Sequence, residues 1–480
     1  MGKVKETAAR KLKFAEALAF LMFFIVFLIW AATKAKIPTG MAVLLCGVTA
    51  GAYGMFVLRI SWDVFFDSIQ KVFMRGIGAI LILLFVGIII GSWLVAGTTP
   101  MLIYYGLKII SPSAFLALAF LLCSIVSMAT GSGWSIMGSF GIALMGVAIG
   151  LGISPALAGA AIASGSYVGD KLSPFSDVPN LNSALTHGTA FDICKAEIPS
   201  SIPGIVVSVV IYLVMGMRYS GGEMDYSLIT PILEGLENTY HFTPLLLLPA
   251  ILVIVAGVLK WPVLPSLFAS GLLGGLCGMI FQGQSFSVVC KIMYSGFTSN
   301  TGLESIDKLL SGGGLNSMLS LILTIMCAFM FAGIIDEMGL LNVLLDKVSR
   351  MASRRGNLIL ASVLTTILGT YMTSSVYVTC IMNSRVWGEA YDRAGLDRIH
   401  LAAVLTEAGS PSGLLVPWSG GALLMMSLFG LQWWEYTPYL FYFWVSIALV
   451  VAYGYMGKFL VLRKDEDAMP EIVSKGADIS

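Results

Sequence analysis

Long uncharged apolar stretches recur along almost the whole chain, between Phe14 and Leu460. A helix needs about 20 apolar residues to cross the hydrocarbon core of a bilayer. Only 11% of the 480 residues are charged, against roughly 25% in an ordinary soluble domain. The sequence therefore predicts an all-α polytopic membrane protein, and it excludes a soluble enzyme, a nucleic-acid-binding protein and a disordered chain. The expected spans lie at about 14–33, 38–58, 77–97, 155–182, 198–217, 243–259, 262–282, 316–336, 399–430 and 436–460.

Two further apolar stretches, 113–150 and 357–390, are interrupted by small polar residues. Each arm beside an interruption has about 15–18 residues, or ~22–27 Å at the helical rise, which is short of a ~30 Å hydrocarbon core. We therefore expect two re-entrant helical hairpins. Helix dipoles and hydroxyl groups at the hairpin tips can face a ligand, although small residues also serve close packing. The expected tip contacts are Thr130, Ser132, Trp134, Ser135, Thr373, Ser374 and Ser375.

The second half of the chain repeats features of the first half. A shift of 243 residues places Trp134 on Tyr377, and the segment 172–176 (Leu-Ser-Pro-Phe-Ser) on 415–419 (Leu-Val-Pro-Trp-Ser). Each half holds five crossings, one hairpin and one broken span, and an odd number of crossings requires that the halves be inverted. Inverted repeats with paired broken helices are typical of secondary transporters. The expected segments are a cytoplasmic N-terminal segment (1–13), a first transmembrane repeat (14–217), an extracytoplasmic linker (218–242), a second transmembrane repeat (243–462) and a cytoplasmic tail (463–480).

The distribution of basic residues predicts the orientation of these segments. With the N-terminus inside, 20 of the 28 Lys and Arg residues fall on the cytoplasmic side and six fall outside, while Lys171 and Lys458 lie within spans. Because cytoplasmic loops carry an excess of positive charge, we expect both termini on the cytoplasmic side of a bacterial-type cytoplasmic membrane. The first apolar stretch is longer than the core of a secretory signal, so we expect it to be retained.

The most informative segment is 164–183, in which ten of twenty side chains offer oxygen atoms. Pro174 and Pro179 cannot donate backbone hydrogen bonds, so the helix must open here and leave carbonyl groups free. Free carbonyl groups at membrane depth are tolerated only where they line a cavity or bind something. The opening lets Asp170 and Asp177, which would be ~10 Å apart along an unbroken helix, approach one site.

Carboxylates, hydroxyls and carbonyls are the ligands that small hard cations prefer, and a buried carboxylate can also bind a proton. We therefore expect sodium to bind through Asp170 and Asp177, with Lys171 either neutralising Asp170 or attracting an anionic substrate. A further intramembrane carboxylate, Glu407, lies in the second broken span. The full set of expected cation- or proton-binding residues is Asp170, Asp177, Ser173, Ser176, Asn180 and Glu407, with Ser410 and Ser412 as further substrate contacts. Seven singly scattered cysteines indicate small buried hydrophobes rather than metal ligands.

Three motifs resemble those of the NhaC-type sodium/proton antiporter family. The segment 164–177 (Ser-Gly-Ser-Tyr-Val-Gly-Asp-Lys-Leu-Ser-Pro-Phe-Ser-Asp) resembles the family's signature, and 130–135 and 407–418 are similar to its other two motifs. The resemblance covers about residues 70 to 460. It implies a dimeric, elevator-like exchanger of internal sodium for external protons in a lipid bilayer, which needs no cofactor and is not an enzyme. Some relatives exchange organic acids or amino acids instead.

Two departures from the family pattern keep the organic substrates open. Val178 and Pro179 stand where the family usually has two threonines, so two hydroxyl groups that could ligate sodium are missing. The tip at Thr373–Ser375 also lacks the usual amide. The alternative function is a sodium- or proton-coupled exchanger of small carboxylates or amino acids. A passive channel is disfavoured, because paired broken helices suit alternating access, and the chain has no phosphate-binding loop for ATP-driven pumping.

Overall fold

The computed structural model describes most of the chain between residues 10 and 463. Ser132 at the first predicted hairpin tip, and the whole predicted cytoplasmic tail except Arg463, lie outside the described residues. The residues outside the description are 1–9, 11, 110, 132, 175, 187, 219–225, 260, 300–306, 308–309, 341, 344–353 and 464–480.

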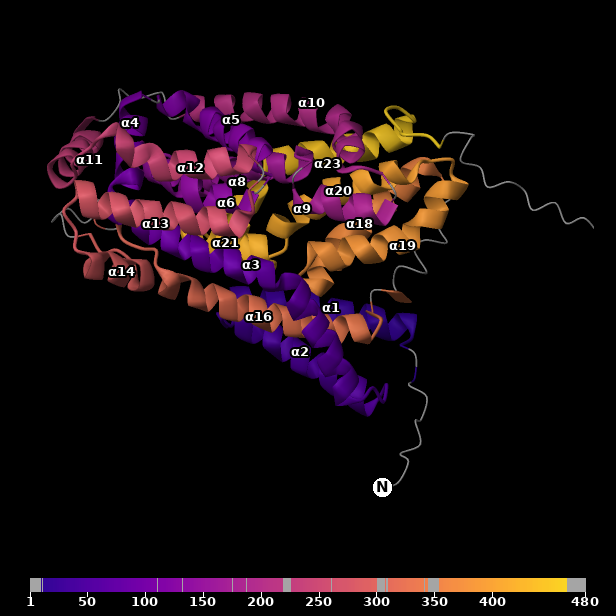
Figure 1. Ribbon diagram of the computed structural model, residues 1–480. Helices are drawn as coiled ribbons and strands as arrows, with labels where there is room; N and C mark the ends of the chain where they lie inside the picture. The colour runs from indigo at the N-terminus through magenta and orange to yellow at the C-terminus, as the bar shows by residue number, and fades with distance from the viewer. Residues whose placement is uncertain are drawn as a thin grey trace, which may run out of the picture.

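All regular elements in the described residues are helices, and most of them run roughly along one direction (Figure 1). Two isolated β-bridges, Phe297 with Gly312 and Leu396 with Leu462, join loop segments. Within the described part of the chain, six helices are long and apolar enough to cross a membrane, and the number rises to ten if each of four sharply bent helix pairs counts as one span. The predicted all-α polytopic class is therefore confirmed.

Four helices form one side of the molecule, at the bottom of Figure 1. They are α1 (Phe14–Thr33), α2 (Thr39–Phe56), α3 (Trp62–Ala96) and α16 (Leu315–Glu337). An edge-to-face contact between Phe24 and Phe331, with ring centroids 5.1 Å apart, ties α1 to α16. The helix α3 is 35 residues long and begins well before the predicted start at residue 77.

The chain breaks at both predicted hairpin tips. The first hairpin consists of α5 (Pro112–Thr130), α6 (Gly133–Ile136), the π-helical turn η1 (Met137–Gly141) and α7 (Ile142–Gly150), and the second of α18 (Arg355–Thr373) and α19 (Val376–Arg393). The stretches Gly133–Gly150 and Arg355–Thr373, with 18 and 19 residues, are long enough to cross a membrane. Arm length therefore does not by itself require re-entry, which stays a prediction.

Both predicted broken spans also open where the repeated Pro-containing segments lie. The helix α8 (Pro155–Leu172) ends before Ser173, and α9 (Asp177–Thr186) starts four residues later. The helices α20 (Arg398–Leu415) and α21 (Gly420–Phe429) are bent by 42° at their break. In both cases the chain extends at the end of the first helix, since Ser173 and Val416 have β-region backbone angles.

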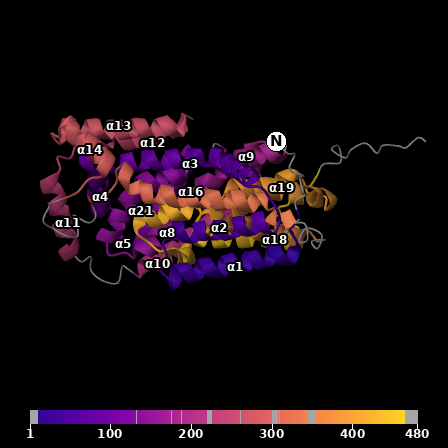
Figure 2. The same ribbon diagram turned by 90° about the horizontal axis from the view of Figure 1, so that it is seen from below.

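The remaining helices pack around the two hairpins and the two broken helices (Figures 1 and 2). The helix α10 begins at Ala190, eight residues before the predicted span, because Thr189 and Asp192 form a capping box there. A helix, α11, also occupies part of the predicted linker. The bounds are α4 (Thr98–Ile109), α10 (Ala190–Met217), α11 (Tyr226–Thr239), η2 (Pro244–Leu247), α12 (Leu248–Val258), α13 (Val263–Phe281), α14 (Phe286–Ser295), α22 (Trp433–Tyr436), η3 (Thr437–Tyr439) and α23 (Phe441–Met456).

The first hairpin packs so closely against the first broken helix that the backbones of α5 and α8 are in contact. A Cβ atom added at Gly169 of α8 would lie 2.0 Å from the carbonyl carbon of Ser127 on α5. The Ser127 hydroxyl group donates to the Gly165 carbonyl oxygen (3.2 Å) and accepts from the Gly169 amide (3.0 Å). Small residues at helix interfaces permit such approach within membranes. This contact fixes the hairpin tip relative to the helix break.

We predict that Gly169→Ala destabilises the protein by roughly 1–3 kcal/mol, the usual cost of overpacking, and therefore lowers the midpoint of thermal unfolding in detergent. The matched control is Gly51→Ala on α2, where the added Cβ would lie 3.5 Å from its nearest neighbour, Cδ1 of Ile334. The control should keep its midpoint or raise it slightly, since alanine favours the helix. Equal midpoints for the two variants would contradict the close packing of α5 and α8.

Candidate ion- and substrate-binding cavity

The two hairpin tips and the two helix breaks meet around one cavity of about 360 Å³. Because each of these four segments ends a helix, each brings helix-terminal polar groups to the centre of the molecule. The helices α3 and α16 close the cavity with apolar side chains, including Ile82 and Phe329. The polar and aromatic residues that line it are Trp134, Tyr167, Asp170, Asp177, Ser374, Ser375, Tyr377, Ser410 and Ser419.

Two carboxyl groups face the cavity from the first break. Asp170 lies in the last turn of α8 and accepts a hydrogen bond from the Ser176 hydroxyl group at 3.3 Å. Asp177 starts α9 and accepts from the Tyr377 hydroxyl group of the second hairpin at 3.4 Å. The Ser410 hydroxyl group approaches Asp170 from α20. The opening of the helix thus brings both aspartates to the same cavity.

Two aromatic side chains from the first half of the chain, Trp134 and Tyr167, pack against the second helix break. A Cβ atom added at Gly420 would lie 2.5 Å from the Trp134 ring, and one added at Gly421 would lie 2.2 Å from the Tyr167 hydroxyl oxygen. Only glycine fits at these two positions without movement of the rings. The first hairpin tip and α8 are therefore fitted closely to the start of α21.

The other predicted contacts lie beside the cavity rather than in its wall. In the first break, Asn180 donates to the carbonyl oxygens of Pro174 (2.8 Å) and Ser176 (2.7 Å) and so holds the opened chain. Ser173 is buried at the end of α8, and Ser412 donates to the Thr370 hydroxyl group at 2.9 Å. At the tips, Thr130, Ser135 and Thr373 also lie outside the lining, and Ser132 is outside the described residues.

The structure separates Lys171 and Glu407 from the cavity and joins them to each other. Their side chains form an ion pair with exposed fractions of 1% and 0%. Lys171 follows Asp170 directly on α8, about 100° further round the helix, and it does not line the cavity. The Lys171 ammonium group also lies 4.7 Å from the centroid of the Tyr442 ring of α23, within range of a cation–π interaction.

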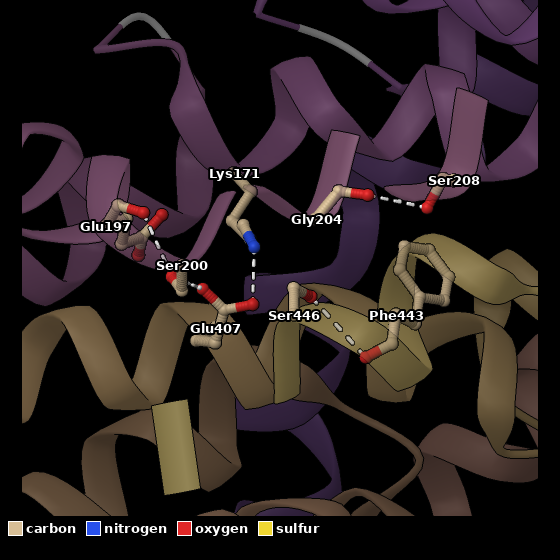
Figure 3. A network of polar contacts seen from close by, with 8 residues as sticks. All are labelled: Lys171, Glu197, Ser200, Gly204, Ser208, Glu407, Phe443 and Ser446. Atoms are coloured by element: carbon tan, nitrogen blue, oxygen red, sulfur yellow. Dashed lines mark hydrogen bonds and ion pairs between the residues drawn. The ribbon is translucent and has the colours of Figure 1, made fainter. Parts of the chain in front are cut away.

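The helix α10 contributes polar side chains next to this ion pair (Figure 3). The Ser200 hydroxyl group donates to the second carboxylate oxygen of Glu407 at 2.9 Å. Glu197, one turn earlier on α10, lies beside the same group and is 2% exposed. We refer to Lys171, Glu197, Ser200 and Glu407 as the charge cluster. The sequence did not point to Glu197, because the span was expected to begin only at residue 198.

The cavity offers the chemistry of a cation site. Its polar atoms are carboxylate, hydroxyl and phenol oxygens, which suit hard cations, and no group of three His, Cys, Asp or Glu residues suited to a metal occurs in the described part of the chain. The aromatic and apolar walls leave space for more than one bare ion. The arrangement can thus hold a small cation, a proton on a carboxylate, or a small organic solute.

Comparison with known proteins identifies the family of this chain. The sequence profile of the Na+/H+ antiporter family matches residues 165–458. A malate-2H(+)/Na(+)-lactate antiporter of Bacillus subtilis is 34% identical over 397 residues, which cover 83% of this chain and 85% of that protein. The arginine/ornithine antiporter ArcD of Halobacterium salinarum is 34% identical over 413 residues, covering 86% and 85% of the two chains.

A third relative carries the family's own name. The Na(+)/H(+) antiporter NhaC of Alkalihalophilus pseudofirmus is 30% identical over 423 residues, which cover 88% of this chain and 91% of that protein. The region matched by the family profile, residues 165–458, includes both helix breaks and therefore both aspartates of the cavity. From the family profile and these relatives, this chain belongs to the Na+/H+ antiporter family, whose members are membrane transporters and not enzymes.

Proposed function

We propose that the protein exchanges internal sodium for external protons, and that Asp170 and Asp177 bind both ions in turn. The observation that carries this proposal is the position of the two carboxyl groups in the lining of one cavity formed by four helix interruptions. Desolvated carboxyl groups bind either a cation or a proton. Binding of one ion then excludes the other, which is the basic requirement of exchange.

The ligands around the two aspartates favour a small hard cation. Oxygen atoms of Ser176, Ser410 and Tyr377 lie near Asp170 and Asp177. The opened chain between α8 and α9 also leaves backbone carbonyl groups outside the helical ladder. In this proposal Lys171 and Glu407, which sequence reasoning placed among the substrate and cation contacts, act by joining the two broken helices. Ser173, Asn180 and Ser412 act by shaping the breaks.

The transport cycle that we propose rests on inversion of the two halves. Helices α5–α9 and α18–α21 have the same order of hairpin and broken helix, which supports an inverted repeat with five crossings in each half. In this arrangement both termini lie in the cytoplasm of a bacterial-type cell, and the hairpins enter from opposite sides. As in other exchangers built from inverted repeats, the central site then opens alternately to either side. We expect the transporter to act as a homodimer.

A second function is favoured by the size of the cavity. A bare sodium ion needs far less than 360 Å³, whereas a small carboxylate or amino acid fits with room for water. Trp134 and Tyr377 provide aromatic walls for such a solute. The relatives named as malate/lactate and arginine/ornithine antiporters handle solutes of this size. Val178 and Pro179, which provide no hydroxyl groups for sodium, also fit this alternative.

We predict that Asp177→Asn abolishes sodium-driven proton movement in proteoliposomes that contain an internal pH dye, because the amide keeps the size of the side chain but cannot bind a proton. The matched control is Asp63→Asn in the first turn of α3, where the carboxyl group is exposed. It should transport at the wild-type rate. Unchanged coupled transport by Asp177→Asn, in protein that elutes normally from a sizing column, would refute the role of Asp177.

The same proteoliposomes separate the two substrate classes. We expect a sodium gradient alone to produce a pH change, since the carboxyl groups exchange the two ions directly. If the pH change requires malate, lactate, arginine or ornithine inside or outside the vesicles, the organic exchanger is the correct function. Movement of charge without coupling to protons or solute would indicate a channel and contradict both functions.

The orientation can be checked by cysteine labelling in a Cys-free background. Ile109→Cys, at the end of α4 before the first hairpin, should react with an impermeant thiol reagent from outside the cell. Asn357→Cys, at the start of α18, should react only after the membrane is opened, and Ser374→Cys at the second tip should react slowly from both sides. Rapid labelling of the cysteines at 109 and 357 from the same side would rule out the inverted arrangement.

A further inference from the structure

The charge cluster contains a carboxyl group that the exchange cycle above does not use. Both carboxyl oxygens of Glu197 are buried, and neither has a hydrogen-bonding partner among the described residues. The neighbouring Thr406 hydroxyl group is already engaged, because it donates to the Ala402 carbonyl oxygen (2.9 Å) and accepts from the Asn182 amide (2.8 Å). A charged carboxylate is strongly disfavoured in such a place, whereas the neutral acid is not.

The groups that face Glu197 leave one negative charge without a partner when Glu197 is ionised. Lys171 of α8 is the positive group, and it is already paired with Glu407 of α20. The helix α23 contributes only the neutral phenols of Tyr442 and Tyr453, and α10 itself contributes the thiol of Cys194. The helix α5 contains no charged residue, and the single acidic group of α9, Asp177, faces the cavity.

A small separate cavity gives access to this carboxyl group. It has a volume of about 20 Å³ and is lined by Glu197, Ser200, His400, Glu407 and Phe459, among others. That volume is about enough for one water molecule. Phe459 is 60% exposed, so the small cavity lies directly beneath the surface near the end of α23. His400 is 7% exposed, and neither of its ring nitrogens has a partner in the described residues.

We propose that Glu197 is a proton-binding site, separate from the central cavity, which takes up a proton when sodium leaves Asp170 and Asp177 and releases it when sodium returns. A second sodium ion is a poor occupant, because the Lys171 ammonium group repels it and the small cavity has no room for a hydration shell. A proton fits this place, because it binds covalently to the carboxylate, neutralises its charge and needs no hydration shell. This inference rests on the proposed sodium/proton exchange and assigns one of its protons to a residue outside the sodium site.

The charge cluster also provides the link between the two sites. Lys171 follows Asp170 directly on α8, and Glu407 lies one turn before Ser410 on α20. The helices α8 and α20 therefore contribute both to the lining of the central cavity and to the surroundings of Glu197. A cation beside Asp170 disfavours a second positive charge nearby, because like charges repel at short range. Binding of sodium therefore weakens binding of the proton, and by linkage the reverse holds. That sign of coupling is the one an antiporter needs.

Infrared spectroscopy of the full-length protein in detergent, titrated with pH, tests the site directly. Wild-type protein should show the carbonyl band of a buried protonated carboxylic acid, and E197Q should lose that band while D177N keeps it. The matched control E389Q, whose carboxyl group is 82% exposed, should keep it as well. A wild-type band in E197Q overturns the proposal. If E197Q does not fold, E197D serves instead, because a shortened side chain must shift the band, and an unshifted band overturns the proposal.

Transport then tests the coupling. In proteoliposomes E197Q should keep sodium self-exchange, measured with ²²Na, and should move fewer protons per sodium ion than the wild-type protein, because only the protons bound at Asp170 and Asp177 remain exchangeable. D177N should lose both activities. A wild-type protein without sodium exchange would refute the proposed function but leave the infrared test valid. E197Q with the wild-type number of protons moved per sodium ion, or with fewer bound sodium ions per chain, would overturn the proton site.

Discussion

The buried ion pair between Lys171 and Glu407 holds together the two helices whose interruptions create the cavity. It joins residues 236 positions apart, one on α8 and one on α20, in a place with almost no contact with solvent. Taking two charges out of water is expensive, and removal of one partner from a buried pair costs about 3–5 kcal/mol. The pair therefore fixes which face of each broken helix points to the cavity: Asp170 and Ser410 can face it because Lys171 and Glu407 face away.

The interruptions themselves follow from a constraint on backbone polar groups. Within a membrane an open backbone is tolerated only where protein or a polar cavity satisfies it. The four helix interruptions meet around one polar cavity, so the same cavity can satisfy the open backbone groups of all four. Side-chain caps such as Ser375 on the Val378 amide (3.4 Å) and Ser419 on the Ala422 amide (3.5 Å) satisfy part of it. The remaining free groups are available to a transported ion.

The sequence predicted those features that depend on local chemistry. Pro174, together with the repeated Leu-x-Pro-x-Ser segments, marked both helix breaks, and the small polar residues marked both hairpin tips. The partner of Lys171 could not be predicted, because nothing in either segment encodes a contact over such a separation. Glu197 was missed for a different reason. Hydropathy placed the start of its helix at residue 198, whereas the capping box of Thr189 and Asp192 starts it at Ala190.

The length of α3 has a consequence for how the cavity can respond to events outside the bilayer. Its 35 residues span roughly 52 Å at the helical rise, well beyond a ~30 Å hydrocarbon core. The charged residues Asp63, Asp67 and Lys71 of its first turns are exposed, whereas Val72, Gly78 and Ile82 further along the same helix line the cavity. A continuous helix acts as a rigid lever. A shift of the polar end of α3 would therefore be transmitted along one continuous helix to the wall of the cavity.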